Sequence, residues 1–428
     1  MSKKILSLDG GGSWAILQAI ALKSIYSDTA IGTNCRSILN QFDLIIANSG
    51  GSLTLAAMIE HADEDIDTVI DMFKNEADRK AIFNALKFFQ HTPIEEAARL
   101  LHFGPKYDAS KKLHGLTQTL PKAGGIKLNR IGKAFEINPD LIICGFDYDT
   151  TRAVFFRSNQ NSPASSRAEY EYTLADAVNA SSNAPVNYFD NPVKVPFGKG
   201  ETPHQLWDGA VGGYNNPVLV GLTEAFAMFK NQCQRSFDDI KVLSLGTGNT
   251  LLPIHGFTAS DVAEAPELMK TMETPSFKGS ILKLAESILS EPPDAANYMA
   301  HMFLGGDVTD GCRAGIVRMN PMLQPFFSSK ESNGKKDTWV FPPHILEEDR
   351  QEFVDLLSLD MDAVEQADVL KIEKLGSWWT ENKVVNQSIR YEGRKFTSKI
   401  GHATFSDAKV EWLSRCNIHA GMVAPLVP

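Results

Sequence analysis

Short apolar runs that end in small residues and lead directly into helix-like segments constrain the fold of this chain most strongly. The run KKILSL at residues 3–8 ends at Asp9 and three glycines, and FDLIIA at residues 42–47 ends in Asn-Ser-Gly-Gly; a helix-like segment follows each. The apolar runs at 139–146 and 240–246 read as further strands. Strands that are buried on both faces and alternate with helices are typical of a parallel sheet covered by helices. The pattern therefore predicts an α/β fold with a mainly parallel central sheet.

The part of the chain after about residue 250 has a different pattern, which is mostly helical. Residues 347–379 have the length and composition of two helices rather than of further strands. The sequence contains no internal repeat and no long low-complexity linker. We therefore expect one compact unit, in which a strand-rich part is followed by a helical C-terminal part.

The composition is that of an ordinary globular protein and excludes several classes of function. Of the 428 residues, 43% are hydrophobic and 22% are charged, and the net charge is −10. Because no long run of Lys and Arg occurs, we expect no DNA or RNA partner. The 5 cysteines are scattered and form no C-x-x-C pair, which argues against a disulfide scaffold or a zinc site and favours a reducing compartment. No signal-peptide core and no membrane-length apolar stretch is present, so we expect a soluble, cytoplasmic protein with at most peripheral membrane contact.

Residues 47–51, Ala-Asn-Ser-Gly-Gly, lie between the second expected strand and its helix. They approximate the nucleophile elbow G-x-S-x-G, in which small residues allow a serine to occupy a sharp turn with its oxygen exposed. Ala47 replaces the first glycine of that pattern. The segment therefore has two interpretations: Ser49 is a catalytic nucleophile, or the segment is a plain connection between strand and helix.

The glycine run after the first expected strand also has competing interpretations. Gly10, Gly12 and Ala15 match G-x-G-x-x-A, the fingerprint of dinucleotide-binding proteins, but the second strand ends without the acid that would hold the ribose. The backbone N–H groups of Gly10, Gly11 and Gly12 are alternatively suited to form an oxyanion hole. A third interpretation is a tight turn that needs positive φ angles.

A nucleophilic serine needs a general base, which is usually a histidine. None of the 10 histidines lies in a recognisable motif. A carboxylate serves instead where burial raises its pKa and it contacts the serine directly. Asp208, in the segment LWDGAVGGYNNP, fits this role because small and turn-forming residues follow it. Read alone, the segment fits a turn aspartate better than a general base.

Together, these segments resemble the patatin-like phospholipases, in particular bacterial members of that family. The family motifs are D-G-G-G-x-R-G, G-x-S-x-G and D-G-[GA], and this chain has LDGGG, ANSGG and DGAVGG in the same order. The segments PKYDASKKLHGLTQTL, ADAVNASSNAPVNYF and VLSLGTG are also similar to segments of the family. The resemblance covers roughly residues 4–250, with weaker similarity as far as Trp379.

The resemblance implies a three-layer patatin-like fold and a phospholipase A-type acyl hydrolase that cleaves fatty-acyl esters of membrane phospholipids. It implies a catalytic domain at residues 1–330, with its core motifs within 4–250, and a C-terminal helical extension at 331–428 packed on the same unit. The substrate would come from a membrane surface, which places the active protein at the inner membrane.

By the same resemblance, Ser49 is the nucleophile and Asp208 is the base of a Ser-Asp dyad that works without histidine. Gly10, Gly11 and Gly12 form the oxyanion hole, and no cofactor or metal is implied. Two positions depart from the family pattern. Trp14-Ala15 stands where the family has Arg-Gly, so no positive charge follows the glycine run directly, and Ala47 replaces the first glycine of the elbow.

Two other functions stay open. The first is the same lipase acting as a signalling effector that a small molecule controls, since some bacterial patatin-like proteins are antiphage effectors activated by cyclic nucleotides. The second is a nucleotide-dependent oxidoreductase, which the missing ribose-binding acid disfavours. Residues 82–103 contain several Phe and Leu side chains that form either a lid or membrane-facing segment, or part of the core. The oligomeric state is left open.

Overall fold

The structure, a computed structural model, describes most of the chain. The residues described are 3–83, 105–159, 171–185, 188–229, 239–250, 292–307, 314–323, 326–327, 339–340, 342, 344–387, 389 and 400–418. Residues 84–103 of the apolar segment discussed above therefore lie outside the described residues.

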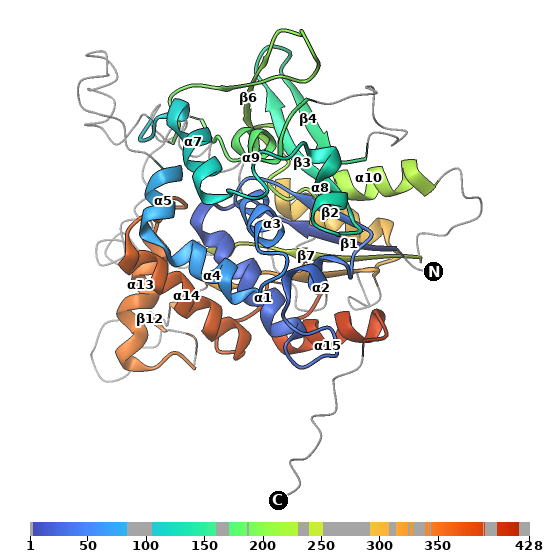
Figure 1. The fold of residues 1–428 in the computed structure, drawn as a ribbon. Helices are drawn as coiled ribbons and strands as arrows, with labels where there is room; N and C mark the ends of the chain where they lie inside the picture. The colour runs from blue at the N-terminus through green and yellow to red at the C-terminus, as the bar shows by residue number, and fades with distance from the viewer. Residues whose placement is uncertain are drawn as a thin grey trace, which may run out of the picture.

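The centre of the protein is an eight-stranded sheet with the order β5-β6-β3-β2-β1-β7-β9, in which β4 also pairs with β3 (Figure 1). The strands are β1 (Lys3–Leu8), β2 (Leu44–Ala47), β3 (Asp140–Asp147), β4 (Arg152–Arg157), β5 (Val193–Val195), β6 (His204–Asp208), β7 (Ile240–Leu245) and β9 (Ile316–Met319). The pairs among β3, β2, β1, β7 and β9 are parallel, whereas β4, β5 and β6 pair in antiparallel fashion. Short pairs outside this sheet are formed by β8 (Asn249–Thr250) with β10 (Met322–Leu323) and by β11 (Phe326–Phe327) with β12 (Trp339–Val340).

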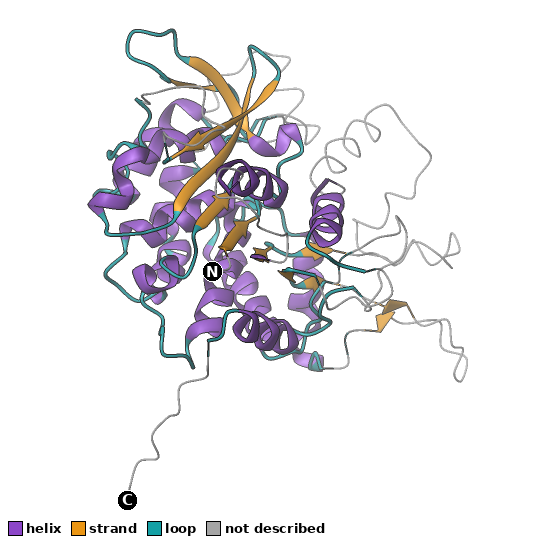
Figure 2. Cartoon of the chain, turned by 90° about the vertical axis from the view of Figure 1, so that its right-hand side faces the viewer, coloured by secondary structure: helices purple, strands orange, loops and turns teal. Residues whose placement is uncertain are grey.

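Helices cover both faces of this sheet, as Figure 2 shows. The α-helices are α1 (Ile16–Tyr26), α2 (Cys35–Leu39), α3 (Gly50–Glu60), α4 (Asp67–Lys74), α5 (Glu76–Ile82), α7 (Ala109–Thr119), α8 (Ile131–Ala134), α9 (Leu174–Ser181), α10 (Val218–Phe229), α13 (Arg350–Ser358), α14 (Gln366–Thr380) and α15 (Phe405–Arg415). Residues 292–303 are also helical. Short 3-10 helices are η1 (Gly12–Ala15), η3 (Leu128–Arg130), η4 (Gly209–Gly212) and η8 (Glu347–Asp349).

The side chains of each central strand alternate between two hydrophobic cores. In β1, Leu6 and Leu8 belong to one core, which includes side chains of α1, α3 and α9, while Ile5 belongs to the other, which includes side chains of α10. In β2, Ile45 and Ile46 divide in the same way. Because both faces of these strands are buried, apolar residues are needed at consecutive positions, as in the apolar runs of the sequence. The predicted α/β fold, with a mainly parallel sheet between helical layers, is confirmed.

The C-terminal helices join the first of these cores. Helix α14 packs along α1, and a methyl group built on Gly376 would lie 2.6 Å from Cδ1 of Ile20, so the two helices approach closely. Trp379 and Trp412 are fully buried in this core. The predicted helical character of the C-terminal part is confirmed by α13, α14 and α15.

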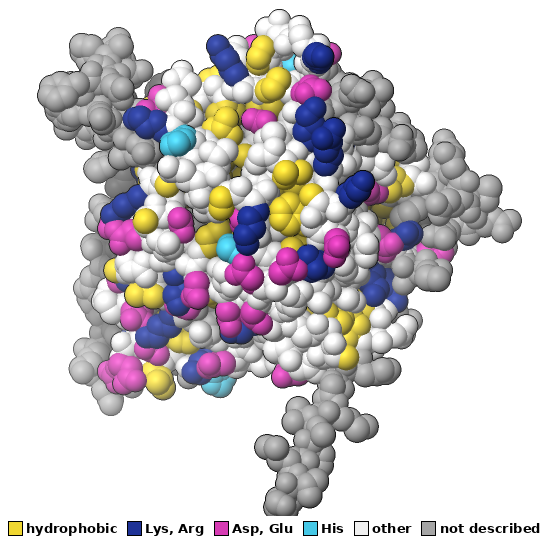
Figure 3. Space-filling model, in the orientation of Figure 1, with side chains coloured by type: hydrophobic (Ala, Val, Ile, Leu, Met, Phe, Trp, Pro, Cys, Tyr) yellow, Lys and Arg dark blue, Asp and Glu magenta, His cyan; other side chains and the backbone are white. Residues whose placement is uncertain are grey.

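Basic and acidic side chains are interspersed over the face of the protein seen in Figure 3. Many of them form ion pairs, such as Lys23 with Asp67 at 2.6 Å. Within the described ranges, no helix combines the length and the apolar character needed to cross a bilayer.

Candidate active site

Ser49 lies at the sharp turn between β2 and α3. Its φ of 48° and ψ of −120° place it outside the regions that a residue with a side chain ordinarily adopts, which costs on the order of 1–3 kcal/mol. The turn needs a glycine at position 50, since a methyl group there would lie 2.6 Å from the Gly12 carbonyl oxygen. The Ser49 N–H donates to Oγ of Ser181 at 2.9 Å, which fixes the turn against the end of α9. The geometry is that of a nucleophile elbow.

Strand register brings Asp208 to the level of Ser49. Asp208 ends β6 and pairs with Gly145 of β3, two residues beyond the pair of Ala47 with Ile143. β6 runs antiparallel to β3 and starts beyond the level at which β2 ends, so this register brings its last residue back to a level just past Ala47. Ala47 itself is fully buried in β2, so the side chain that replaces the elbow glycine is accommodated.

The Asp208 carboxylate is 2% exposed and accepts several hydrogen bonds. Its Oδ1 accepts from Asn48 Nδ2 at 2.9 Å and from the Ala210 N–H at 2.8 Å. The Ser49 side chain lies near enough to this carboxylate to lower its pKa. Burial raises the pKa of Asp208 above its usual value, although these hydrogen bonds and the charge of Lys112 act in the opposite direction. A carboxylate with a raised pKa beside a serine hydroxyl has the properties of a general base.

The glycine run lies beside Ser49, but its N–H groups are not equivalent. A methyl group on Gly10 would lie 2.9 Å from Cβ of Ser49, so the run passes directly over the elbow. The Gly10 N–H donates to the carbonyl of Asn215 at 2.8 Å, so it already has an acceptor in this structure. No hydrogen bond of the Gly11 or Gly12 N–H is found within the described part of the chain.

A buried ion pair supports the start of the glycine run, and the sequence did not indicate it. Arg318 of β9 donates to Asp9 Oδ2 at 2.7 Å and to Ser244 Oγ at 2.9 Å. Asp9 and Arg318 are 3% and 4% exposed. Burial raises the pKa of Asp9 to about 6, even though Arg318 lowers it. Arg318 thus supplies, from another strand, a positive charge near the glycine run.

Trp14 packs where the family has arginine. It is 7% exposed and belongs to the main hydrophobic core. Its indole N–H donates to the carbonyl of Asp360 at 3.0 Å, and the neighbouring Ser13 N–H donates to the carbonyl of Met361 at 3.0 Å. Trp14 therefore joins the glycine run to a segment between α13 and α14.

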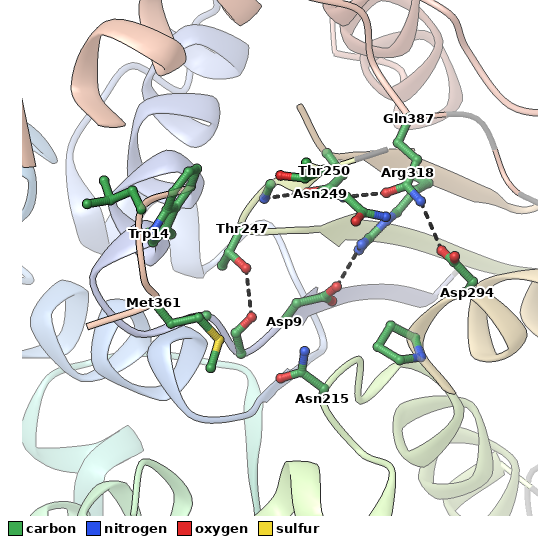
Figure 4. A pocket seen from close by; sticks show the side chains of 16 residues that line it. Asp9, Trp14, Asn215, Thr247, Asn249, Thr250, Asp294, Arg318, Met361 and Gln387 are labelled. Carbon is green, nitrogen blue, oxygen red and sulfur yellow. Dashed lines mark hydrogen bonds and ion pairs between the residues drawn. The ribbon is translucent and has the colours of Figure 1, made fainter. Parts of the chain in front are cut away.

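Two cavities flank the glycine run and share Met361 in their walls. The one at Ser49 is small, about 30 Å³, and includes Phe83, Phe189 and Asp362 in its wall. The second is lined by Gly10 and Gly11 of the run and has a volume of about 220 Å³. Figure 4 shows its polar lining, which includes the following side chains: Asp9, Asn215, Thr247, Asn249, Thr250, Asp294, Arg318 and Gln387.

Two carboxylates hold the segment that carries Met361 against the body of the protein. Lys106 contacts Asp360 at 2.7 Å and Asp362 at 3.2 Å. Tyr188 donates to Asp360 at 2.8 Å, and Tyr107 donates to Asp362. Met361 and Asp362 of this segment thus line the cavity at Ser49, a position that no local sequence pattern indicates.

The pair of Ser49 and Asp208 includes no histidine of the described ranges. His204 Nδ1 lies 2.8 Å from Asp147 Oδ2, at the opposite end of β6 from Asp208. Within the described ranges, no hydrogen bond links a histidine to Ser49 or Asp208, and no group of three or more His, Cys, Asp or Glu side chains is arranged to hold a metal ion.

A sequence profile of the patatin-like phospholipases matches residues 6–222, which is half of the chain and includes Ser49 and Asp208. The chain belongs to the patatin-like phospholipase family. Membership supports a lipid hydrolase activity. A search of curated proteins finds no match.

Solved structures give only distant similarities. Human GIVD cytosolic phospholipase A2 is 16% identical over 37% of this chain and 22% of that chain, with a TM-score of 0.22. The same human enzyme in complex with methyl γ-linolenyl fluorophosphonate and terbium chloride is 11% identical over 97% of this chain and 60% of that chain, with a TM-score of 0.38. VipD from Legionella pneumophila is 10% identical over 100% of this chain and 92% of that chain, with a TM-score of 0.31. The chain thus spans less than two thirds of the human structures, and nothing about its activity is taken from these similarities.

Proposed function

We propose that this protein is a phospholipase A-type acyl hydrolase in which Ser49 is the nucleophile and Asp208 is the general base. The observation that carries the proposal is the strained strand-to-helix turn that places Ser49 beside a carboxylate that is 2% exposed and that is held by the Asn48 side chain next to Ser49. The substrate is the fatty-acyl ester of a lipid presented at a membrane surface.

In the acylation step, Asp208 accepts the hydroxyl proton of Ser49 as Oγ attacks the ester carbonyl carbon. The N–H groups of Gly11 and Gly12 donate to the oxygen that becomes negatively charged, and preorganised donors of this kind stabilise the transition state strongly. Asp208 then returns the proton to the alcohol of the lipid, which leaves as the C–O bond breaks. The product is an acyl ester on Ser49 and a lysolipid.

In the deacylation step, Asp208 accepts a proton from water as the water oxygen attacks the acyl carbon. The bond to Ser49 Oγ breaks, Ser49 regains the proton, and the fatty acid is released. Asn48 and the Ala210 N–H keep the carboxylate oriented in both steps, because both donate to its Oδ1.

The products of phospholipid hydrolysis test this function. Purified protein mixed with phosphatidylcholine or phosphatidylglycerol vesicles is expected to release free fatty acid and lysophospholipid, as identified by mass spectrometry, and Ser49→Ala is expected to release neither. Release of diacylglycerol or of a free head group would instead indicate cleavage at the phosphate and would contradict an acyl hydrolase.

The rate should fall with acid at a higher pH than for an ordinary aspartate. Asp208 acts as a base only when it is ionised, and burial raises its pKa above the usual value of 3.8. The activity is therefore present above the raised pKa and is lost as the pH falls through it. A pH profile of kcat/KM for a soluble ester measures this acidic limb, the range over which the rate falls as the pH falls. A profile that stays flat down to about pH 4 would exclude Asp208 as a base with a raised pKa.

A second candidate function is the same hydrolase held in a closed state until a ligand or a membrane opens it. The observation that favours it is the cavity at Ser49, whose volume of about 30 Å³ is far smaller than an acyl chain requires and whose wall includes Met361 and Asp362. The polar cavity on the other side of Met361, at about 220 Å³, is smaller than the roughly 300–1,000 Å³ of sites for drug-sized ligands. It therefore gives no specific support to a nucleotide activator.

Weakening the contacts of residues 360–362, here called the closing segment, should raise the rate of lipid hydrolysis. Lys106→Met removes the cation that contacts both Asp360 and Asp362. These contacts are partly exposed, so each contributes about 0.2–1 kcal/mol, and the loss of both should increase the rate on vesicles by about two- to thirtyfold. Lys133→Met, at an exposed position on α8, is the matched control. A lower or unchanged rate for Lys106→Met would argue against a closed state held by this segment.

A further inference from the structure

Lys112 is a fully buried lysine that the mechanism above does not use. It lies on the buried stripe of α7, together with Ala109, Gly115 and Leu116, and its side chain is 0% exposed. The adjacent Lys111 has the ordinary arrangement for a lysine, since it is partly exposed and pairs with Asp108 at 2.6 Å. Burial of a lysine is costly, and a position on an apolar stripe would usually carry an apolar residue.

The contacts of Lys112 are polar but include no ion pair within the described ranges. Its Nζ donates to the carbonyl of Asn179 at 2.9 Å and lies 4.3 Å from the centre of the Phe189 ring. Asn179 is in the last turn of α9, where the negative end of the helix dipole favours a cation. The face of an aromatic ring also attracts a cation. Both contacts therefore favour the protonated form of Lys112.

The end of α9 that Lys112 contacts, together with the residues just after it, accepts backbone hydrogen bonds from both members of the proposed dyad. Ser181 Oγ accepts the N–H of Ser49 at 2.9 Å. The carbonyl of Asn183 accepts the N–H of Asp208 at 3.0 Å. Phe189, beneath the ammonium, lines the cavity at Ser49. Lys112 thus contacts the end of α9, next to the residues that hydrogen-bond to Ser49 and Asp208, and it also contacts Phe189 in the wall of the cavity at Ser49.

Asp208 is the charged group that affects the pKa of Lys112, and it raises this pKa. Burial lowers the pKa of Lys112 well below its usual value, and the negative charge of Asp208 opposes this shift. In return, Lys112 lowers the pKa of Asp208, although burial dominates there. The other titratable side chains on α5, α7, α9 and the segments that flank them are Glu76, Asp78, Arg79, Lys80, Tyr107, Asp108, Lys111, His114, Asp176, Tyr188 and Asp190. The Cys144 thiol also faces Asp208, and burial and the charge of Asp208 raise its pKa, so it stays protonated.

We propose that Lys112 is a positioning residue for the Ser49–Asp208 pair: its ammonium fixes the last turn of α9 and favours the ionised, base-competent form of Asp208. The inference rests on the proposed function and adds to it a buried cation behind the general base. It also explains why the cost of burying a lysine on the apolar stripe of α7 is tolerated.

Kinetics of charge-removing variants test this role. Lys112→Gln keeps a donor for the Asn179 carbonyl but removes the charge, whereas Lys112→Met removes both. In each variant, the acidic limb of the kcat/KM profile should move to higher pH, and the rate should recover as the pH rises. Lys112→Arg should keep the limb close to its original position, because the charge remains. Lys111→Met is the matched control and should leave the profile unchanged. A uniform loss of rate with an unmoved limb would indicate packing alone and would overturn the proposal.

A measurement without substrate keeps the inference separate from the proposed function. In protein with ¹³C-labelled aspartate, the Asp208 carboxyl signal is assigned by its absence in Asp208→Asn, and its titration midpoint is measured. The midpoint should be higher in folded Lys112→Gln or Lys112→Met than in the wild type. An unchanged midpoint overturns the role of Lys112, even if Ser49-dependent hydrolysis is normal. Absence of Ser49-dependent hydrolysis in the wild type would instead refute the proposed function, and the midpoints would still decide the inference.

Discussion

Ser49→Ala and Asp208→Asn are each expected to lower kcat/KM for ester hydrolysis by at least about 10³-fold, since removal of one member of a catalytic unit typically costs this much or more. Ser49→Ala removes the attacking oxygen. Asp208→Asn keeps the shape of the side chain but cannot accept the proton of Ser49. The fold should be preserved in both, because neither change creates a cavity. Steady-state hydrolysis of a soluble ester, together with thermal melts, measures the two effects.

The double variant should be no slower than the more impaired single variant, because the two side chains act as one unit. Matched controls are Ser414→Ala and Asp71→Asn, both at exposed positions, which should hydrolyse the ester at the wild-type rate. Near-normal hydrolysis by Asp208→Asn would rule out the dyad, and a loss caused by replacement of a histidine would point to a different base.

Trp14→Ala is expected to lower the free energy of unfolding by about 3–5 kcal/mol, the usual cost of truncating a buried tryptophan to alanine. The side chain is 7% exposed, and its N–H donates to the Asp360 carbonyl at 3.0 Å. Activity should fall as well, because the glycine run and the closing segment lose the side chain that joins them. Trp14→Phe keeps most of the packing and loses one hydrogen bond, a net cost of about 0.5–1.5 kcal/mol.

Denaturant unfolding and ester hydrolysis of these variants separate packing from chemistry. Tyr148→Ala is the matched control, because this large aromatic side chain is 55% exposed and its loss should change stability by less than about 0.5 kcal/mol. Trp14→Arg should not restore activity typical of the family, since Arg318 already pairs with Asp9 and a second guanidinium would be buried in an apolar core. If Trp14→Ala unfolds like the wild type yet is inactive, the packing role is wrong and a contact with substrate is indicated.

The fold could be predicted from the sequence because the patterns that indicate its strands and helices are local. Buried strands followed at once by helices identify a parallel sheet, and residues that follow parallel strands meet at one edge of that sheet. Ser49 and the glycine run follow two such strands, which explains why they lie side by side. Asp208 could be placed with them only through the resemblance to a family, since it ends an antiparallel strand whose register no local pattern specifies.

Other features of the site depend on contacts between distant parts of the chain. The Gly10 N–H donates to the carbonyl of Asn215, more than 200 residues away. Arg318, on a different strand, pairs with Asp9 at the start of the glycine run. Lys112 follows another lysine in a polar helix, so its burial left no signal in the pattern. None of these pairings has a sequence spacing from which it could be inferred.

Covalent labelling of Ser49 tests the central claim most directly. A fluorophosphonate probe reacts with an activated serine hydroxyl, and the modified peptide identifies the residue. The dyad predicts one label, on Ser49, that is absent in Ser49→Ala and forms at least about 10²-fold more slowly in Asp208→Asn, as expected when a general base is lost. A label on a different residue, or labelling of Asp208→Asn at the wild-type rate, would contradict the assignment of Ser49 as nucleophile and Asp208 as its base.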